Sequence, residues 1–334
     1  MLGATEVDWQ PYIFLQDNHG KVWVAQRSSK DSKTWTWKNV GCPFTDSNGN
    51  CEMLKWLGAT SVRDGLNEPQ RPYLFVTKDK VYNLWRDKNE VWHWSDMGCP
   101  AGKGKCGKEK LEGLGATRTI DDSSPSERPY LFAIDHNTSK VWSLWWDAMH
   151  MTWHWSDLGC PAGECGKKYN GLGDMMTNAM VRTTIDDDGF DIGNTRHPYV
   201  FVVEADDPEK VHYLRLLDKK QDKQIGTWKE ARRKDRKRII GVVSVLIHNG
   251  IIPVIVSEKK DSRISLEYLA PNDPDKWHGR DYDCSSCALH SAIPISGTHI
   301  PNGSGVIMYG YFGGLKEGGY FGEEFLPEFK TYSF

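Results

Sequence analysis

Polar and charged residues suited to ligand binding recur at one position of a repeated sequence pattern. They follow short apolar segments, three of which begin with the same four residues at 2–5, 57–60 and 114–117. Arginine and histidine can donate hydrogen bonds to a developing oxyanion, and aspartate can transfer protons. The set comprises Asp8, Trp9, Arg63, Asp64, Asp121, Asp187, His248, Asn249 and His299, with Arg118 and Arg182 inside the segments.

If these segments are the innermost strands of a ring of sheets, their ends meet at one opening. The residues would then form a polar rim around a small-molecule site with aromatic walls, which is a common pocket composition. The competing interpretation is that they are ordinary turn residues, because Asp and Asn favour turns in any protein.

The repeat itself predicts the elements that would position them. Each unit of roughly 55 residues contains four apolar runs separated by turn residues. The second run reads Pro11–Phe14, Arg71–Phe75 and Arg128–Phe132, and the unit closes with a Trp-x-Trp word such as Trp92–Trp94. We expect these tryptophans to pack between sheets rather than to stack on sugars, because they recur at one structural position.

Four short strands per unit indicate one antiparallel blade, and a ring of blades buries both faces of each sheet. The predicted fold is therefore all-β, a single six-bladed β-propeller. Its blades are expected at residues 2–56, 57–113, 114–176, 177–238, 239–291 and 292–334.

Eight cysteines fall into four close pairs, three of which begin with Gly-Cys-Pro. A pair repeated once per unit predicts a local disulfide, which implies an oxidising compartment such as the secretory pathway, a vesicular lumen or the cell exterior. Zinc is the alternative, but only the last pair has a metal-like spacing. The expected disulfides are Cys42–Cys51, Cys99–Cys106, Cys160–Cys165 and Cys284–Cys287. Two glycosylation triplets, Asn137–Ser139 and Asn302–Ser304, agree with this compartment.

Charge and hydropathy narrow the range of partners. The formal net charge is −3, from 42 basic and 45 acidic residues, which does not indicate a nucleic-acid partner. No apolar segment approaches the ~20 residues that span a membrane. The basic run 232–238 is expected to be a solvated turn rather than a contact for an anionic surface.

Over residues 2–230 the rhythm Arg-x-Tyr, turn, Lys-Val-x, then Trp resembles the six-bladed fungal fucose lectins. The resemblance implies that Arg71 and Arg128 bind sugar. It also implies a glutamate at the fourth residue of the third strand, where this chain departs from the family. That position holds Val24, Asn83, Ser143, Tyr213 or Leu266, and Glu267 is one residue away. Since no two candidate pockets are expected to share a lining, a single asymmetric site is favoured over one site per blade.

A lectin-like propeller without those carboxylates also resembles the fungal hetero-Diels–Alderases of tropolone-sesquiterpene biosynthesis. The resemblance implies an enzyme that joins a quinone methide to a humulene-type alkene without metal or cofactor. Holding two reactants in a near-attack geometry can supply ~7–11 kcal/mol. Arg63, His248 and His299 are the expected donors to the enone oxygen, and Asp64 or Asp187 the acid or base for dehydration.

Three functions thus follow from the sequence. The favoured one is a pericyclase with small apolar and aromatic substrates. The alternatives are a secreted glycan-binding lectin with atypical pockets and a non-catalytic interaction propeller, because a fold does not by itself determine a function.

Overall fold

The structure is a computed structural model, and its contacts divide the chain into two compact units, residues 1–177 and 178–334. The residues it describes are 2–8, 10–27, 34–63, 68–100, 110–120, 127–147, 150–171, 180–182, 196–216, 227–247, 250–261, 263–270, 273–282, 292–299 and 306–312. The part of the chain so described includes no helix long and apolar enough to cross a membrane.

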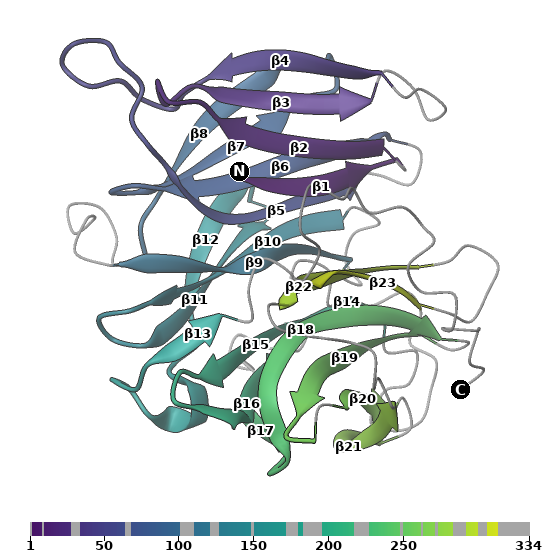
Figure 1. Ribbon diagram of the computed structural model, residues 1–334. Helices are drawn as coiled ribbons and strands as arrows, with labels where there is room; N and C mark the ends of the chain where they lie inside the picture. Colours follow the sequence, from purple (N-terminus) through teal and green to yellow (C-terminus); the bar gives the residue numbers. More distant parts are fainter. Residues whose placement is uncertain are drawn as a thin grey trace. The chain divides into compact units, whose positions relative to one another are not determined.

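The first unit contains three four-stranded antiparallel sheets, which we call blades 1–3 (Figure 1). Each is a meander in which consecutive strands pair, as the four apolar runs of each repeat predict. Blade 1 is β1 (Gly3–Val7), β2 (Gln10–Gln16), β3 (Val22–Arg27) and β4 (Trp35–Gly41). Blade 2 is β5 (Lys55–Arg63), β6 (Gln70–Thr77), β7 (Val81–Arg86) and β8 (Trp92–Gly98). Blade 3 is β9 (Leu111–Ile120), β10 (Glu127–Asp135), β11 (Lys140–Asp147) and β12 (Thr152–Asp157), and β13 (Tyr169–Gly171) follows the short helix η1 (Pro161–Gly163).

The second unit contains blades 4–6. Blade 4 is β14 (Met180–Arg182), β15 (Arg196–Glu204), β16 (Asp207–Arg215) and β17 (Lys229–Arg232). Blade 5 is β18 (Arg236–Ile247), β19 (Gly250–Lys259), β20 (Ile264–Ala270) and β21 (Asp273–Tyr282). Of blade 6 the described residues contain the hairpin β22 (Ala292–His299) and β23 (Val306–Phe312).

The glycines of the repeat allow the innermost strands of neighbouring blades to approach closely. A Cβ at Gly58 of β5 would lie 2.7 Å from the backbone nitrogen of Ala116 in β9. A Cβ at Gly113 would lie 2.0 Å from the carbonyl oxygen of Leu57. Both positions therefore exclude any side chain, because such contacts are far inside van der Waals distance.

The Trp-x-Trp words of blades 2 and 3 pack against the preceding blade, which confirms the packing interpretation over the sugar-stacking one for these two words. The first tryptophan of each word contacts a phenylalanine of the preceding blade edge-on. The second tryptophan donates its indole N–H to a backbone carbonyl of the preceding blade. The edge-on pairs are Phe14–Trp92 and Phe75–Trp153, and in blade 5 the single tryptophan Trp277 makes the same contact with Phe201. The hydrogen bonds run from Trp94 to Val40 (2.9 Å) and from Trp155 to Met97 (3.0 Å).

Local disulfides close the loops that leave the outer strands, as the repeated cysteine pairs predict. Cys42 bonds Cys51 and Cys160 bonds Cys165. Cys99 is also disulfide-bonded. Cys106, Cys284 and Cys287 lie outside the described residues, so the other two predicted pairings stay predictions.

Between blades 4 and 5 an ion pair lies where other blades pack leucines. Glu267 stands opposite Ile255, just as Leu84 stands opposite Leu74 in blade 2. Its carboxylate accepts hydrogen bonds from the guanidinium of Arg236, whose side chain is fully buried, and from the Ser257 hydroxyl at 3.1 Å. Arg236 also donates to the carbonyls of Glu209 and Ala231 in blade 4.

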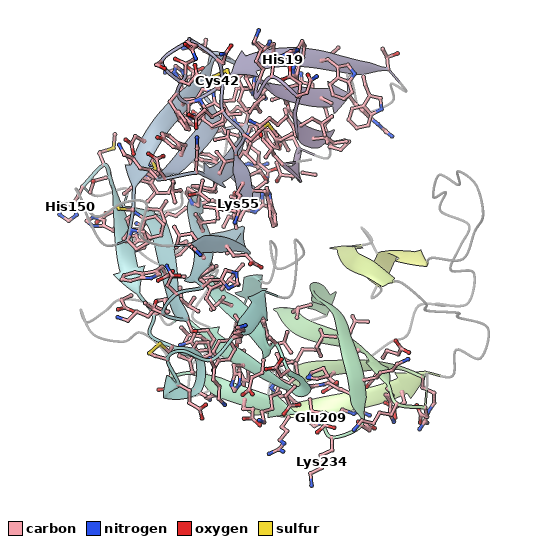
Figure 2. The ribbon with its side chains drawn as sticks, turned by 60° about the vertical axis from the view of Figure 1, so that its left-hand side comes forward. His19, Cys42, Lys55, His150, Glu209 and Lys234 are labelled. Carbon is pink, nitrogen blue, oxygen red and sulfur yellow. A yellow bond between two sulfur atoms is a disulfide. The ribbon has the colours of Figure 1, made fainter. Side chains whose placement is uncertain are left out.

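Further charges extend this pair into a network. The ammonium of Lys259 lies 2.8 Å from Asp235 and 2.6 Å from Asp281. Arg233 contacts the same two carboxylates, each at 2.7 Å. The expected solvated turn at 232–238 is therefore wrong for Arg233 and Arg236, because both side chains are satisfied by carboxylates of their own unit. The exposed Lys260 ammonium donates to both the Glu209 carboxylate and the Lys234 carbonyl. Glu209 and Lys234 are labelled in Figure 2.

The Asp235 and Asp281 carboxylates of this network make the stability of the second unit depend on pH in the acid range. Burial alone would raise the pKa of Asp235, but hydrogen bonds from Arg233 and Lys259 outweigh it and bring the pKa to about 2. The pKa of Asp281 is lowered in the same way, against the opposing effect of burial, by Lys259 and Arg233. A lowered carboxylate pKa stabilises the fold above the unfolded-state value near 3.9 and loses that contribution as the pH falls toward 2.

We therefore expect the urea midpoint of the wild-type protein to fall as the pH goes from 5 to 2. The Asp235→Asn, Asp281→Asn variant should be less stable than wild type at pH 5 and show a shallower decrease. If the urea midpoints of the two proteins fell with pH at the same rate, Asp235 and Asp281 would not be the source of the pH dependence.

Candidate functional site

The ends of the innermost strands bring predicted site residues together in the first unit. The Asp8 carboxylate, just after β1, lies 2.8 Å from the guanidinium of Arg63 at the end of β5. Gln70, the first residue of β6, completes the link, since its side chain accepts from the Asp8 N–H at 2.9 Å and its own N–H donates to Asp8 at 3.2 Å. Asp8 has φ +46°, an uncommon conformation that Asp tolerates in turns.

Glu127 continues this cluster into blade 3. One carboxylate oxygen accepts from the Arg63 N–H at 2.8 Å, and the other lies 3.4 Å from the Arg118 guanidinium. Arg118 also donates to the Ser61 hydroxyl at 3.0 Å. We call Asp8, Ser61, Arg63, Gln70, Arg118 and Glu127 the inner cluster. Arg63 and Arg118 keep 38% and 27% of their side-chain surface exposed, so both can meet a ligand.

Sequence reasoning missed Glu127, and it included Gln70 only as the end of the loop 65–70, which was expected to form a wall of the opening. Each directly precedes the arginine of an Arg-Pro-Tyr word, so their equivalence was visible in the repeat. What no pattern revealed is that hairpin pairing places Gln70 directly opposite Arg63.

The other predicted members cannot be added to this cluster. Trp9, Asp64, Asp121, Asp187, His248 and Asn249 lie outside the described residues. Arg182 and His299 are placed only as backbone positions, at the end of β14 and at the end of β22. Whether they face the same opening stays a prediction.

A second set of polar and aromatic residues lies on the face of blade 2 that turns toward blade 3. Along β6, Arg71 and Tyr73 share this face, and Trp85 and His93 follow on β7 and β8 as successive cross-strand partners. The Tyr73 and Trp85 rings are stacked at 6.4 Å, and the imidazole of His93 lies 4.8 Å from Trp85. The Asp87 carboxylate is 3.0 Å from His93 Nε2, and this hydrogen bond is the main reason that the pKa of Asp87 is lowered.

Blade 3 repeats this set, contrary to the expectation that no two linings would match. Tyr130, Trp145 and His154 stack in the same order, with centroid distances of 6.2 and 5.0 Å. In both blades the tryptophan indole donates to a serine hydroxyl at 3.1 Å, Ser95 in blade 2 and Ser156 in blade 3. The matching positions are Arg71 and Arg128, Tyr73 and Tyr130, Trp85 and Trp145, Asp87 and Asp147, and His93 and His154. Asp147 contacts His154 at 3.6 Å and additionally His150 at 2.8 Å, the latter at the edge of the first unit (Figure 2).

Asn83 gives the blade-2 face a buried polar group without a protein partner. It lies on β7 between Phe75 and Ser95, and the residue is 1% exposed. Neither its amide oxygen nor its amide nitrogen has a hydrogen-bond partner among the described residues. Since an unsatisfied buried amide costs about 1–3 kcal/mol, this amide would gain from a hydrogen bond to a ligand or to a water molecule.

Blade 1 lacks most of this set. Gln10 occupies the arginine position, and Gln26 stands opposite Tyr12 where the tryptophan would be. The Arg86 guanidinium of blade 2 lies 5.3 Å from the Tyr12 ring, so the space beside that ring holds a protein cation. Burial raises the pKa of Tyr12, although Arg86 acts in the opposite direction. The blade-2 and blade-3 faces are therefore the matched pair within the first unit.

Comparison with known proteins supports the fold. No protein-family model and no curated protein matches the chain. Among solved structures, an AofleA variant from Arthrobotrys oligospora with three arginine-to-alanine substitutions aligns over 93% of this chain and 79% of its own, at 12% identity and a TM-score of 0.52.

Two structures of the Aleuria aurantia lectin also align over 93% of this chain and 90% of their own. One, in complex with alpha-methyl-L-fucoside, has 12% identity and a TM-score of 0.49. The other, described as a six-bladed β-propeller with a novel fucose recognition mode, has 14% identity and a TM-score of 0.47. The antiparallel blades and the similarity to AofleA confirm the predicted fold class, an all-β, six-bladed β-propeller.

Proposed function

We propose that this protein is a glycan-binding lectin whose sites are the matched faces of blades 2 and 3. The observation that carries the proposal is the buried, unpartnered amide of Asn83 on a face that also presents Arg71 and stacked aromatic rings. That combination suits a polyol, because hydroxyl groups both donate and accept hydrogen bonds, as an amide does.

Each face carries groups that can bind both the apolar and the polar parts of a sugar ring. Aromatic rings pack against its C–H groups, and an arginine fork binds neighbouring hydroxyls. In blade 2 the neutral amide of Asn83 would take the place of the glutamate carboxylate expected at this position. Because neutral hydrogen bonds contribute about 0.5–1.5 kcal/mol each, weaker binding per site is expected than with an ionised acceptor.

Two similar weak sites on one chain become effective together on a surface that displays many glycans. The second contact is then intramolecular and is favoured by a high effective concentration. The glycan-binding chemistry of the fold neighbours is consistent with this proposal. The proposal includes secretion of the protein, and the local disulfides support secretion because disulfides persist in oxidising compartments.

We expect the Arg71→Ala, Arg128→Ala variant to lose glycan-array binding, with each single variant retaining part of it. The reason is that each substitution removes the cation from one of two sites that act jointly. Array binding with sugar competition and calorimetry measure the effect. Arg263→Ala, which removes a partly exposed arginine paired with Asp261, is the matched control and should bind as wild type. Undiminished binding by the double variant would reject the proposal.

The inner cluster favours a second candidate, a pericyclase acting on a quinone methide and a humulene-type alkene. Three of the predicted residues, Asp8, Arg63 and Arg118, gather there, and the Arg63 Nε atom is buried without a partner among the described residues. Incubation with the two reactants should then give a stereochemically biased adduct, and Arg63→Gln should reduce its rate while Arg71→Ala should not. A racemic adduct at the background rate would reject this candidate.

A further inference from the structure

The turn between β10 and β11 carries a modification motif that glycan binding does not use. Asn137, Thr138 and Ser139 form an Asn-x-Ser sequon at the tip of this hairpin, and Asn137 is exposed. The turn is well defined, since the Thr138 hydroxyl donates to the Asp135 carboxylate at 2.7 Å and the Ser139 N–H donates to the Asp135 carbonyl at 2.7 Å.

The hydroxyl of the sequon is not available in the folded protein. Ser139 is 4% exposed, and its Oγ donates to the Lys167 carbonyl. Lys167 follows the Cys160–Cys165 loop, and this loop contacts the turn twice more. The Gly166 N–H donates to the Thr138 carbonyl at 3.3 Å, and the Cys160 sulfur lies 3.7 Å from the same oxygen.

We propose that Asn137 is an N-glycosylation site whose use is limited by closure of the Cys160–Cys165 disulfide. The transferase recognises both the asparagine and the hydroxyl two residues later, so the acceptor must be an open chain. Once the disulfide holds the loop against the turn, Ser139 is withdrawn. Disulfide formation and glycosylation take place in the same oxidising compartment, so the two compete in time.

In the transfer step, a bond forms between Asn137 Nδ2 and the anomeric carbon of an oligosaccharide carried on a lipid pyrophosphate. The bond from that carbon to the pyrophosphate oxygen breaks, the lipid pyrophosphate leaves, and the amide loses one proton. Asn137 follows the far end of β10, about 25 Å from Glu127 at ~3.3 Å per residue. The attached glycan would therefore lie away from the inner cluster.

The experiment expresses the full chain through a eukaryotic secretory pathway and measures occupancy by mass spectrometry after peptide N-glycosidase treatment, which converts a glycosylated asparagine to aspartate. Wild type should show partial occupancy at Asn137, and Asn137→Gln and Ser139→Ala should show none. Thr138→Ala disturbs the turn but keeps the sequon, so it should stay glycosylated.

The Cys160→Ser, Cys165→Ser variant should increase occupancy at Asn137, whereas Cys42→Ser, Cys51→Ser, which opens a loop in blade 1, should not. Absence of glycan from Asn137 in both wild type and the Cys160→Ser, Cys165→Ser variant would overturn the site. Equal occupancy in all disulfide variants would overturn the competition. Neither outcome depends on whether the protein binds glycans.

Discussion

Replacing Asn83 with Leu is expected to remove one glycan site while leaving the folded protein as stable as before, or more stable. Leucine has a similar volume and no polar atoms, so the substitution removes a buried amide that the chain leaves unsatisfied. That should stabilise the fold by about 1–3 kcal/mol. Losing both amide hydrogen bonds to the ligand should weaken the blade-2 site by a similar amount, or about tenfold for each 1.4 kcal/mol.

The opposite signs of the two effects make the prediction specific. Calorimetry should detect one fewer site per chain, and urea denaturation an unchanged or higher midpoint. Asn18→Leu, which replaces an exposed amide in the β2–β3 turn, is the control and should alter neither quantity. A variant that is clearly less stable would mean that Asn83 has a structural partner, and one that binds as before would exclude blade 2 as a site.

The repeat allowed the blades of the first unit to be predicted from sequence because their periodic words mark strand after strand. The expected second runs at Arg71–Phe75 and Arg128–Phe132 lie within β6 and β10. In blade 5 the words have almost disappeared, yet apolar β-branched runs still indicated its strands. The first strand of blade 5, β18, begins at Arg236, inside the basic run that was expected to be a solvated turn.

The site was harder to predict, since it depends on pairing across strands. Glu127 was passed over because it is unremarkable within its own strand. The equivalence of the blade-2 and blade-3 faces was missed for a related reason. Comparing only the fourth residue of the third strand shows Asn83 and Ser143, which differ, whereas the surrounding tyrosine, tryptophan, histidine and aspartate are the same.

The charges of blade 5 illustrate the limit of reasoning from charge runs. A basic run is normally solvated, and nothing local distinguishes Arg236 from Lys234. The difference arises because β18 begins at Arg236, which directs its guanidinium toward Glu267 on β20. The partner is 31 residues away and occupies a position that is apolar in blades 2 and 3.

Breaking this pair on one side should therefore be among the most damaging substitutions in the protein. Glu267→Leu leaves the buried Arg236 guanidinium without a carboxylate, and removing one member of a buried ion pair typically costs about 3–5 kcal/mol. Urea denaturation should show this loss, and limited proteolysis should locate the opening in residues 178–334. Asp261→Ala, which removes an exposed carboxylate paired only with Arg263 among the described residues, should have little effect.

Replacing both partners should recover much of that stability. In the Arg236→Met, Glu267→Leu variant no charge of the pair remains buried, and the introduced leucine would stand opposite Ile255 as Leu84 stands opposite Leu74. Recovery should be incomplete, because the Glu209 and Ala231 carbonyls lose the donor that joins blade 4 to blade 5. A double variant more stable than Glu267→Leu would show that much of the loss in Glu267→Leu comes from the buried, unpaired guanidinium of Arg236. A double variant less stable than Glu267→Leu would instead mean that the Arg236 contacts with blade 4 outweigh its pairing with Glu267.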